Sequence, residues 1–197
     1  MKDYYNRKIK EFGADSKGVD WNGPESHFLR FKQLAKIISD NEFSLLDYGC
    51  GYGALVDYLD TTNSKFRYTG YDIAEEMIKA GTKKYLTRAG VRLTGEFESI
   101  GIHDYCISNG LFNVKLDADE TEWKKYIIDT LDKMDRLCEK GFSFNLLTSY
   151  SDAERMKDYL FYAEPARMFN HCKVAYSKHI ALLHDYPLYE FTILVKK

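Results

Sequence analysis

Proline is scarce in this sequence, with 3 residues among 197, and no apolar run approaches the length of a membrane span. A composition of 45% apolar and 29% charged residues is typical of an ordered globular protein, so we expect disorder only at the N-terminal tip. Residues 1–7 are too polar for a secretory signal. The length fits a single domain over 1–197, in which we predict a leader over 1–40 and a sheet core over 41–197.

An excess of charge of either sign is also missing, because 28 Lys and Arg residues nearly balance 30 Asp and Glu residues. No strong electrostatic field therefore favours nucleic acid as a partner. The four cysteines have no Cys-x-x-Cys spacing, so we expect reduced thiols and no metal site. They are Cys50, Cys106, Cys138 and Cys172. These absences predict a cytoplasmic protein that binds neither nucleic acid nor a membrane.

Three glycines at alternate positions follow a short apolar strand in the segment SLLDYGCGYG, residues 44–53. Glycine allows bare backbone to approach a ligand, and a helix that begins there exposes its N–H groups. A second strand ends at Asp72, 19 residues after Gly53, which suits a carboxylate that accepts hydrogen bonds from both ribose hydroxyls. The two pieces predict a site for a nucleoside cofactor; the alternative is a glycine-rich turn with no ligand.

The same segment also fits a dinucleotide fingerprint, Gly49-x-Gly51-x-x-Ala54. Asp47 lies two residues before Gly49 and would repel a pyrophosphate, but it would attract the sulfonium and amino groups of S-adenosylmethionine. Roughly forty residues precede the first strand, whereas dinucleotide domains usually open on it. S-adenosylmethionine is therefore the favoured cofactor, and NAD is the alternative.

On these residues the chain resembles the class I S-adenosylmethionine-dependent methyltransferases, from about residue 20 to the C-terminus. Its 46–53 segment is similar to their first motif and its 71–73 segment to their second. The resemblance implies that Asp72 binds the ribose, that Ile73 packs on adenine and that the glycine turn accommodates the methionine moiety. The expected cofactor-binding residues are Asp47, Gly49, Cys50, Gly51, Gly53, Asp72, Ile73, Glu96, Phe97 and Asn109, with Trp21 and Arg30 from a leader that closes over the cofactor.

Asn109 stands where the family's fourth motif falls, but the Pro-Pro-aromatic run of enzymes that methylate nucleic-acid bases does not follow it. This departure argues against methylation of a base.

Apolar periodicity and turn signals outline the elements. We predict strands over 43–47, 66–72, 91–93, 105–108, 141–147, 178–183 and 189–195. We predict helices over 24–38, 55–59, 75–86, 119–140, 152–161 and 165–172, of which those at Asp119 and Ser151 open on capping signatures. The connection over 184–188 is too short for a parallel crossover, so the last two strands must be antiparallel. The family resemblance implies an α/β fold, a Rossmann-like three-layer αβα sandwich with a mostly parallel seven-stranded sheet of order 3-2-1-4-5-7-6 that ends in an antiparallel hairpin.

Ligands of such sheets bind beyond the carboxyl ends of the parallel strands, and His184 follows one of them. We predict it as the catalytic base for a hydroxyl or amine acceptor; the alternative is a polar hairpin residue. An anionic acceptor needs no base, and Arg155 or Arg167 would then hold it. The candidate substrate contacts are Tyr150, Tyr162, Arg167 and Tyr186, although the aromatic stretch over 159–169 also suits core packing.

These features together predict an enzyme that transfers a methyl group to a small molecule, with oxygen favoured over nitrogen. The resemblance is greatest to small bacterial methyltransferases of surface-glycan or secondary-metabolite biosynthesis, which implies such a pathway. Two alternatives stay open: an NAD-dependent oxidoreductase, and a non-catalytic module that only binds the cofactor. The acceptor and the oligomeric state do not follow from the sequence.

Overall fold

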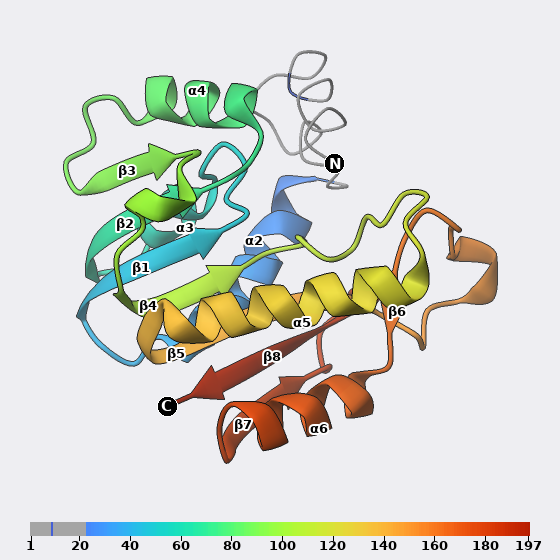
Figure 1. Cartoon of the computed structure of the whole chain (residues 1–197). Helices are drawn as coiled ribbons and strands as arrows, with labels where there is room; N and C mark the ends of the chain where they lie inside the picture. The colour runs from blue at the N-terminus through green and yellow to red at the C-terminus, as the bar shows by residue number, and fades with distance from the viewer. Residues whose placement is uncertain (1–8, 10–22) are drawn as a thin grey trace.

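A single sheet with helices on both faces forms the protein (Figure 1). The structure is a computed structural model that describes residue 9 and residues 23–197, so the leader residue Trp21 lies outside the described part. The strands are β1 (Glu42–Tyr48), β2 (Lys65–Tyr71), β3 (Val91–Thr94), β4 (His103–Ser108), β5 (Cys138–Thr148), β6 (Tyr162–Ala163), β7 (His179–Leu183) and β8 (Glu190–Lys196).

The strand order is β3-β2-β1-β4-β5-β8-β7, and the short β6 pairs with the end of β5. Strands β1 to β6 pair in parallel, whereas β8 is antiparallel to both β5 and β7. Apart from β6, which was not predicted, this is the expected order with its C-terminal hairpin. The carboxyl ends of β1, β2, β4, β5 and β7 therefore lie along one edge of the sheet.

The helices cover the two faces and enclose two apolar cores (Figure 1). They are α2 (Pro24–Leu34), α3 (Leu55–Leu59), α4 (Glu75–Lys84), α5 (Glu120–Arg136) and α6 (Pro165–Ala175). Successive residues of β1 divide between the cores, because Leu45 packs with α2, α3 and α4 while Leu46 packs with α5. The predicted cap of α5 is confirmed: the Asp119 side chain accepts hydrogen bonds from the N–H groups of Thr121 and Glu122.

The predicted helix over 152–161 is wrong. The chain forms only a 3-10 turn, η4 (Ala153–Arg155), and then a loop that leads into β6. Nearly every residue of 152–160 is exposed, so a helix here would bury no apolar face, and packing of such a face supplies most of a helix's stability. The Ser151 hydroxyl, expected as a helix cap, instead donates to the Thr148 carbonyl oxygen at 2.7 Å.

The boundary between α5 and β5 also differs from the prediction, because the helix ends at Arg136 and the strand already begins at Cys138. Gly141, predicted to end the helix, lies within β5 and has a φ of +151°. A Cβ atom at this position would lie 2.4 Å from the Val195 carbonyl oxygen of β8. Gly141 is therefore required by the close approach of two strands and not by a helix end.

We expect Gly141→Ala to lower the free energy of unfolding by about 1–3 kcal/mol, because the added methyl group must displace the backbone of β8. Urea denaturation measures this change. Gly101→Ala is the matched control, since a Cβ atom there meets nothing within 4 Å. Equal stability of the two variants would contradict the explanation.

Candidate functional site

The loops that follow β1, β2 and β4 meet at the carboxyl edge of the sheet. The N–H groups of Gly49 and Cys50 both donate to the carbonyl oxygen of Tyr71, the last residue of β2, at 2.8 and 3.0 Å. A Cβ atom on Gly49 would lie 2.9 Å from Cδ1 of Leu111, in the loop after β4. The turn needs glycine for its conformation as well, because φ is positive at Gly49, Gly51 and Gly53.

Asp72 binds the glycine turn directly. Its Oδ2 accepts a hydrogen bond from the Gly51 N–H at 2.8 Å, and its Oδ1 accepts one from the Ala74 N–H at 2.8 Å. Burial raises the pKa of the Asp72 carboxyl, while these N–H groups act in the opposite direction. The Ile73 N–H is a third backbone donor to this carboxylate, which has about four lone-pair sites, so an acceptor site remains for a ribose hydroxyl. Ile73, next in the chain, is 46% exposed and offers the apolar surface expected beside a base.

Asp47 lies beneath the glycine turn and is only 3% exposed. Its Oδ2 accepts a hydrogen bond from the Tyr68 hydroxyl at 2.7 Å. Burial raises the pKa of Asp47 to about 7 despite this bond. The sequence predicts a negatively charged Asp47 near the methionine end of the cofactor. The structure instead gives a buried group whose charge changes near neutral pH.

The other residues of the turn and of the β3 loop are placed as follows. The Cys50 thiol donates to the Gly51 carbonyl oxygen at 3.3 Å, and burial raises its pKa well above the ordinary value. Phe97 is half-buried, with its ring centroid 5.7 Å from that of Tyr71, so it lies beside the end of β2. Glu96 is exposed. All four cysteines are free thiols, as predicted.

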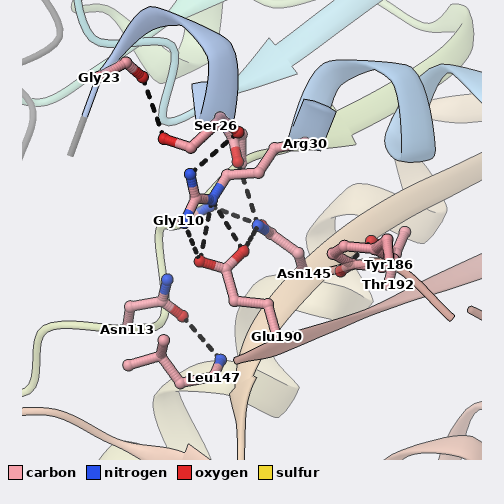
Figure 2. Close-up of polar contacts among 11 residues, drawn as sticks. Gly23, Ser26, Arg30, Gly110, Asn113, Asn145, Leu147, Tyr186, Glu190 and Thr192 are labelled. Carbon is pink, nitrogen blue, oxygen red and sulfur yellow. Dashed lines mark hydrogen bonds and ion pairs between the residues drawn. The ribbon is translucent and has the colours of Figure 1, made fainter. Parts of the chain in front are cut away.

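A buried polar network joins α2 to the strands at the same edge (Figure 2). The Arg30 guanidinium donates to both carboxylate oxygens of Glu190, the first residue of β8, with Nε to oxygen distances of 2.9 Å. The Asn145 amide of β5 donates to Glu190 Oε2 at 2.7 Å and to Asn109 Oδ1 at 3.1 Å. Arg30, predicted to contact the cofactor, thus contacts a carboxylate of the chain itself.

Sequence reasoning missed Glu190 and Asn145. Glu190 is the only charged residue of the segment EFTILV, and Asn145 is the only amide residue of the segment FSFNLL. A polar group that is buried in a strand needs a hydrogen-bonding partner, so these two residues could have indicated a buried polar network.

His184 and Tyr150 lie together on the rim of the sheet. Both are exposed, and their ring centroids are 6.0 Å apart. The strand before His184 is β7, at the outer edge of the sheet, which β5 and β8 separate from β4. Strands β4 and β7 are thus three strand spacings, about 14 Å, apart, whereas the His184 ring itself lies 6.1 Å from the Phe191 ring of β8.

The other predicted substrate contacts differ in burial and in their partners. Tyr186 is buried, and its hydroxyl is 3.0 Å from the Thr192 hydroxyl. The Tyr162 hydroxyl accepts from the Lys157 N–H at 3.0 Å. Arg167 is exposed and pairs with Glu164 one turn earlier in the chain. Each of these three side chains therefore has a polar partner nearby in the chain itself.

Two absences hold for residue 9 and residues 23–197. No group of three or more histidine, cysteine, aspartate or glutamate side chains is arranged to hold a metal ion. No helix in this part of the chain combines the length and apolar character needed to cross a bilayer.

Comparison with known proteins agrees with this architecture. A family model described as "Methyltransferase domain" matches residues 46–141, which include the glycine turn, Asp72 and Asn109. The protein Rv1506c of Mycobacterium tuberculosis strain H37Rv, whose name assigns it provisionally to the methyltransferases, is 50% identical over 155 residues. The match covers 79% of this chain and 93% of that relative.

Solved methyltransferase structures share the fold. The N-methyltransferase NodS of Bradyrhizobium japonicum, in complex with S-adenosylhomocysteine, is similar with a TM-score of 0.68 and 14% identity, over 100% of this chain and 97% of that chain. The magnesium protoporphyrin IX methyltransferase of Synechocystis, with bound S-adenosylmethionine, has a TM-score of 0.65 and 13% identity, over 100% and 94%. The 16S rRNA methylase ArmA has a TM-score of 0.58 and 15% identity, over 100% and 97%.

The identity to Rv1506c extends over most of both chains, and the predicted strand order and glycine turn are those of the matched family. The chain therefore belongs to the methyltransferase family.

Proposed function

We propose that this protein transfers a methyl group from S-adenosylmethionine to an oxygen atom of a small molecule. The main support is the hydrogen bond that joins Asp72 to the glycine turn, because it places a carboxylate that can accept from a ribose beside a turn with three glycines. When bound, the cofactor supplies a methyl group attached to a positively charged sulfur. The methyl group passes to the acceptor, and the electron pair of the broken bond between carbon and sulfur stays on sulfur.

Each part of the site has a proposed role. Asp72 binds the ribose hydroxyls, and Ile73 and Phe97 border the adenine. The turn from Gly49 to Gly53 accommodates the methionine moiety. Buried Asp47 stabilises the cationic groups of the ligand from beneath the turn, because a nearby positive charge favours the ionised carboxylate. Asn109, at the end of β4, borders the position of the methyl group.

The chain's main contribution to the rate is alignment, since the methyl group is already activated. Holding the acceptor in line with the methyl carbon and excluding water can supply several kcal/mol, roughly 7–11 kcal/mol at the upper end for well-oriented reactants. A hydroxyl acceptor must also lose its proton. His184 stays the predicted base. Because it directly follows the outer strand β7, the acceptor must extend from Asn109 toward the rim formed by His184 and Tyr150.

The acceptor is proposed to be a metabolite of surface-glycan or secondary-metabolite biosynthesis that is methylated in the cytoplasm. The near balance of charges disfavours nucleic acid, and the exposed Tyr150 and His184 offer flat rings to a small ring-shaped molecule. The enzymes of similar structure are named for different acceptors: magnesium protoporphyrin IX for the Synechocystis enzyme and 16S rRNA for ArmA. The fold therefore leaves the acceptor open, and only the site can select it.

Isothermal titration of the purified protein with S-adenosylmethionine, S-adenosylhomocysteine and NAD tests the proposal. Binding of the first two without NAD is the expected result. Binding of NAD alone would favour the oxidoreductase alternative. Cofactor binding without methylated product across a broad panel of acceptors would favour the non-catalytic module.

Asp72→Ala is expected to weaken the binding of S-adenosylhomocysteine by about 1–3 kcal/mol, roughly 5- to 150-fold, because the ribose hydroxyls lose their acceptor. Titration calorimetry measures the affinity, and the melting temperature checks that the variant is folded. Asp158→Ala, in the exposed loop before β6, is the control and should bind as the wild type does. An Asp72→Ala protein with unchanged affinity would remove Asp72 from the site.

Asp47→Asn is expected to change stability and binding in opposite directions. Because burial raises the pKa of Asp47 to about 7, the native state binds more protons than the unfolded state between about pH 4 and 7, and its stability falls as the pH rises through that range. The neutral variant should therefore gain stability over the wild type at pH 8 more than at pH 5, measured by urea denaturation. Equal differences at both pH values would contradict a raised pKa.

The same variant should bind S-adenosylmethionine more weakly than the wild type, and the ratio of the two affinities should grow from pH 6 to pH 7.5 as Asp47 ionises. The ligand's own ionisation cancels in this ratio. A constant ratio would show that Asp47 does not act on the ligand through its charge.

A further inference from the structure

The network in Figure 2 contains a fully enclosed ion pair, since Arg30 is 7% exposed and Glu190 is 1% exposed. The loss of hydration offsets most of the attraction in such a pair, and apolar replacements are often equally stable. Stability alone therefore does not explain why α2 and β8 meet through charges at this point. The alternative use of a buried pair is to fix the geometry of its neighbours, and those neighbours lie at the proposed site.

The orientation of the Asn145 amide follows from its partners. The Gly110 N–H can only donate, and it lies 2.7 Å from Asn145 Oδ1. The Glu190 carboxylate, paired with Arg30, can only accept, and it lies 2.7 Å from Asn145 Nδ2. A rotated amide would set a donor against a donor and an oxygen against an oxygen. The side chain of Asn145 is therefore held in one orientation.

Asn145 in turn fixes Asn109. The Asn145 amide nitrogen carries two protons, of which one is donated to Glu190 and the other to Asn109 Oδ1 at 3.1 Å. Asn109 must therefore direct its carbonyl oxygen to the network. Its NH2 group, on the other branch of the amide, is directed away from Asn145. The Asn109 residue directly follows β4, in the loop whose Leu111 contacts Gly49.

We propose that Arg30, Glu190 and Asn145 are positioning residues that present the NH2 group of Asn109 to the methyl-acceptor position, and that they thereby select an oxygen acceptor. This inference rests on the proposed function. It assigns a role to two residues, Glu190 and Asn145, that no motif of the sequence singled out.

The preference for oxygen follows from lone pairs. An acceptor oxygen uses one lone pair to form the bond to the methyl carbon and keeps another that can accept a hydrogen bond from Asn109. An amine nitrogen has a single lone pair, so a hydrogen bond from Asn109 would block the attack. The bond between sulfur and the methyl carbon breaks with its electrons left on sulfur. The proton of a hydroxyl acceptor leaves to a base or to water.

Sinefungin allows a test without a known acceptor, because it carries a CH–NH3+ unit in place of the methylsulfonium group. Calorimetry compares its affinity with that of S-adenosylhomocysteine, which has nothing at the methyl position. An NH2 donor beside the ammonium group is unfavourable, so Asn109→Ala should raise the preference for sinefungin by about threefold or more. A carbonyl oxygen beside it would be favourable. A fall or no change in the preference on Asn109→Ala would overturn the proposal.

Asn145→Ala separates positioning from general support of the fold. The freed Asn109 amide can rotate its oxygen toward the ammonium group, and the preference for sinefungin should rise by about fivefold or more. A purely structural role would weaken both ligands together. In the double variant Asn109→Ala/Asn145→Ala, the preference for sinefungin should be no higher than in Asn109→Ala alone. A higher preference in the double variant would contradict action through Asn109. If Asn145→Ala does not fold, the Asn109→Ala result still decides the orientation.

Asn113→Ala is the matched control, since this asparagine lies in the same loop but accepts from the Leu147 N–H at 3.1 Å. Its ratio of affinities should equal that of the wild type. Failure of the wild type to bind S-adenosylhomocysteine at all would contradict the proposed function itself. Normal binding with the wrong change in the ratio would contradict only the inference about Asn109.

Discussion

The site depends on one set of hydrogen bonds, in which two consecutive N–H groups, of Gly49 and Cys50, donate to the carbonyl oxygen of Tyr71. The positive φ of Gly49 belongs to the turn that allows both groups to reach one acceptor. Because Tyr71 ends β2, these bonds place Asp72 beneath the Gly51 N–H, 2.8 Å away. The turn and the carboxylate are thus joined by hydrogen bonds within the chain itself.

Buried charge is the second feature that organises this edge of the sheet. Asp47 lies under the turn with a pKa raised to about 7, and Glu190 is enclosed with Arg30 between α2 and β8. Each arrangement removes charge from water, and this loss of hydration offsets most of the attraction between buried charges. Both lie where a cationic donor and its acceptor are proposed to bind. Functional sites that require charges at defined positions are commonly less stable than the rest of a fold.

The sequence predicted the sheet well and the segment after β5 poorly. Alternating and continuous apolar runs located the seven main strands, and the five-residue connection over 184–188 required the antiparallel hairpin. Ser151 and Glu154 matched a helix cap, but the residues that follow remain exposed and form no helix. The capping pattern is local, whereas a helix also needs a surface on which to pack. Gly141 was wrongly predicted as a helix end for a similar reason. A glycine is required there by the close backbone of β8, which is distant in sequence.

The amino-acid sequence by itself determined the main strands, the antiparallel hairpin, the glycine turn and the spacing to Asp72, because these follow from local periodicity and from short connections. The strand order was implied by the resemblance to the methyltransferase family. The tertiary structure alone decided that Asp47 is buried, that the His184 ring lies beside those of Tyr150 and Phe191, and that Arg30 meets Glu190, 160 residues later in the chain. Burial and pairing of this kind depend on which distant elements pack together. A local sequence pattern does not predict which distant elements pack together.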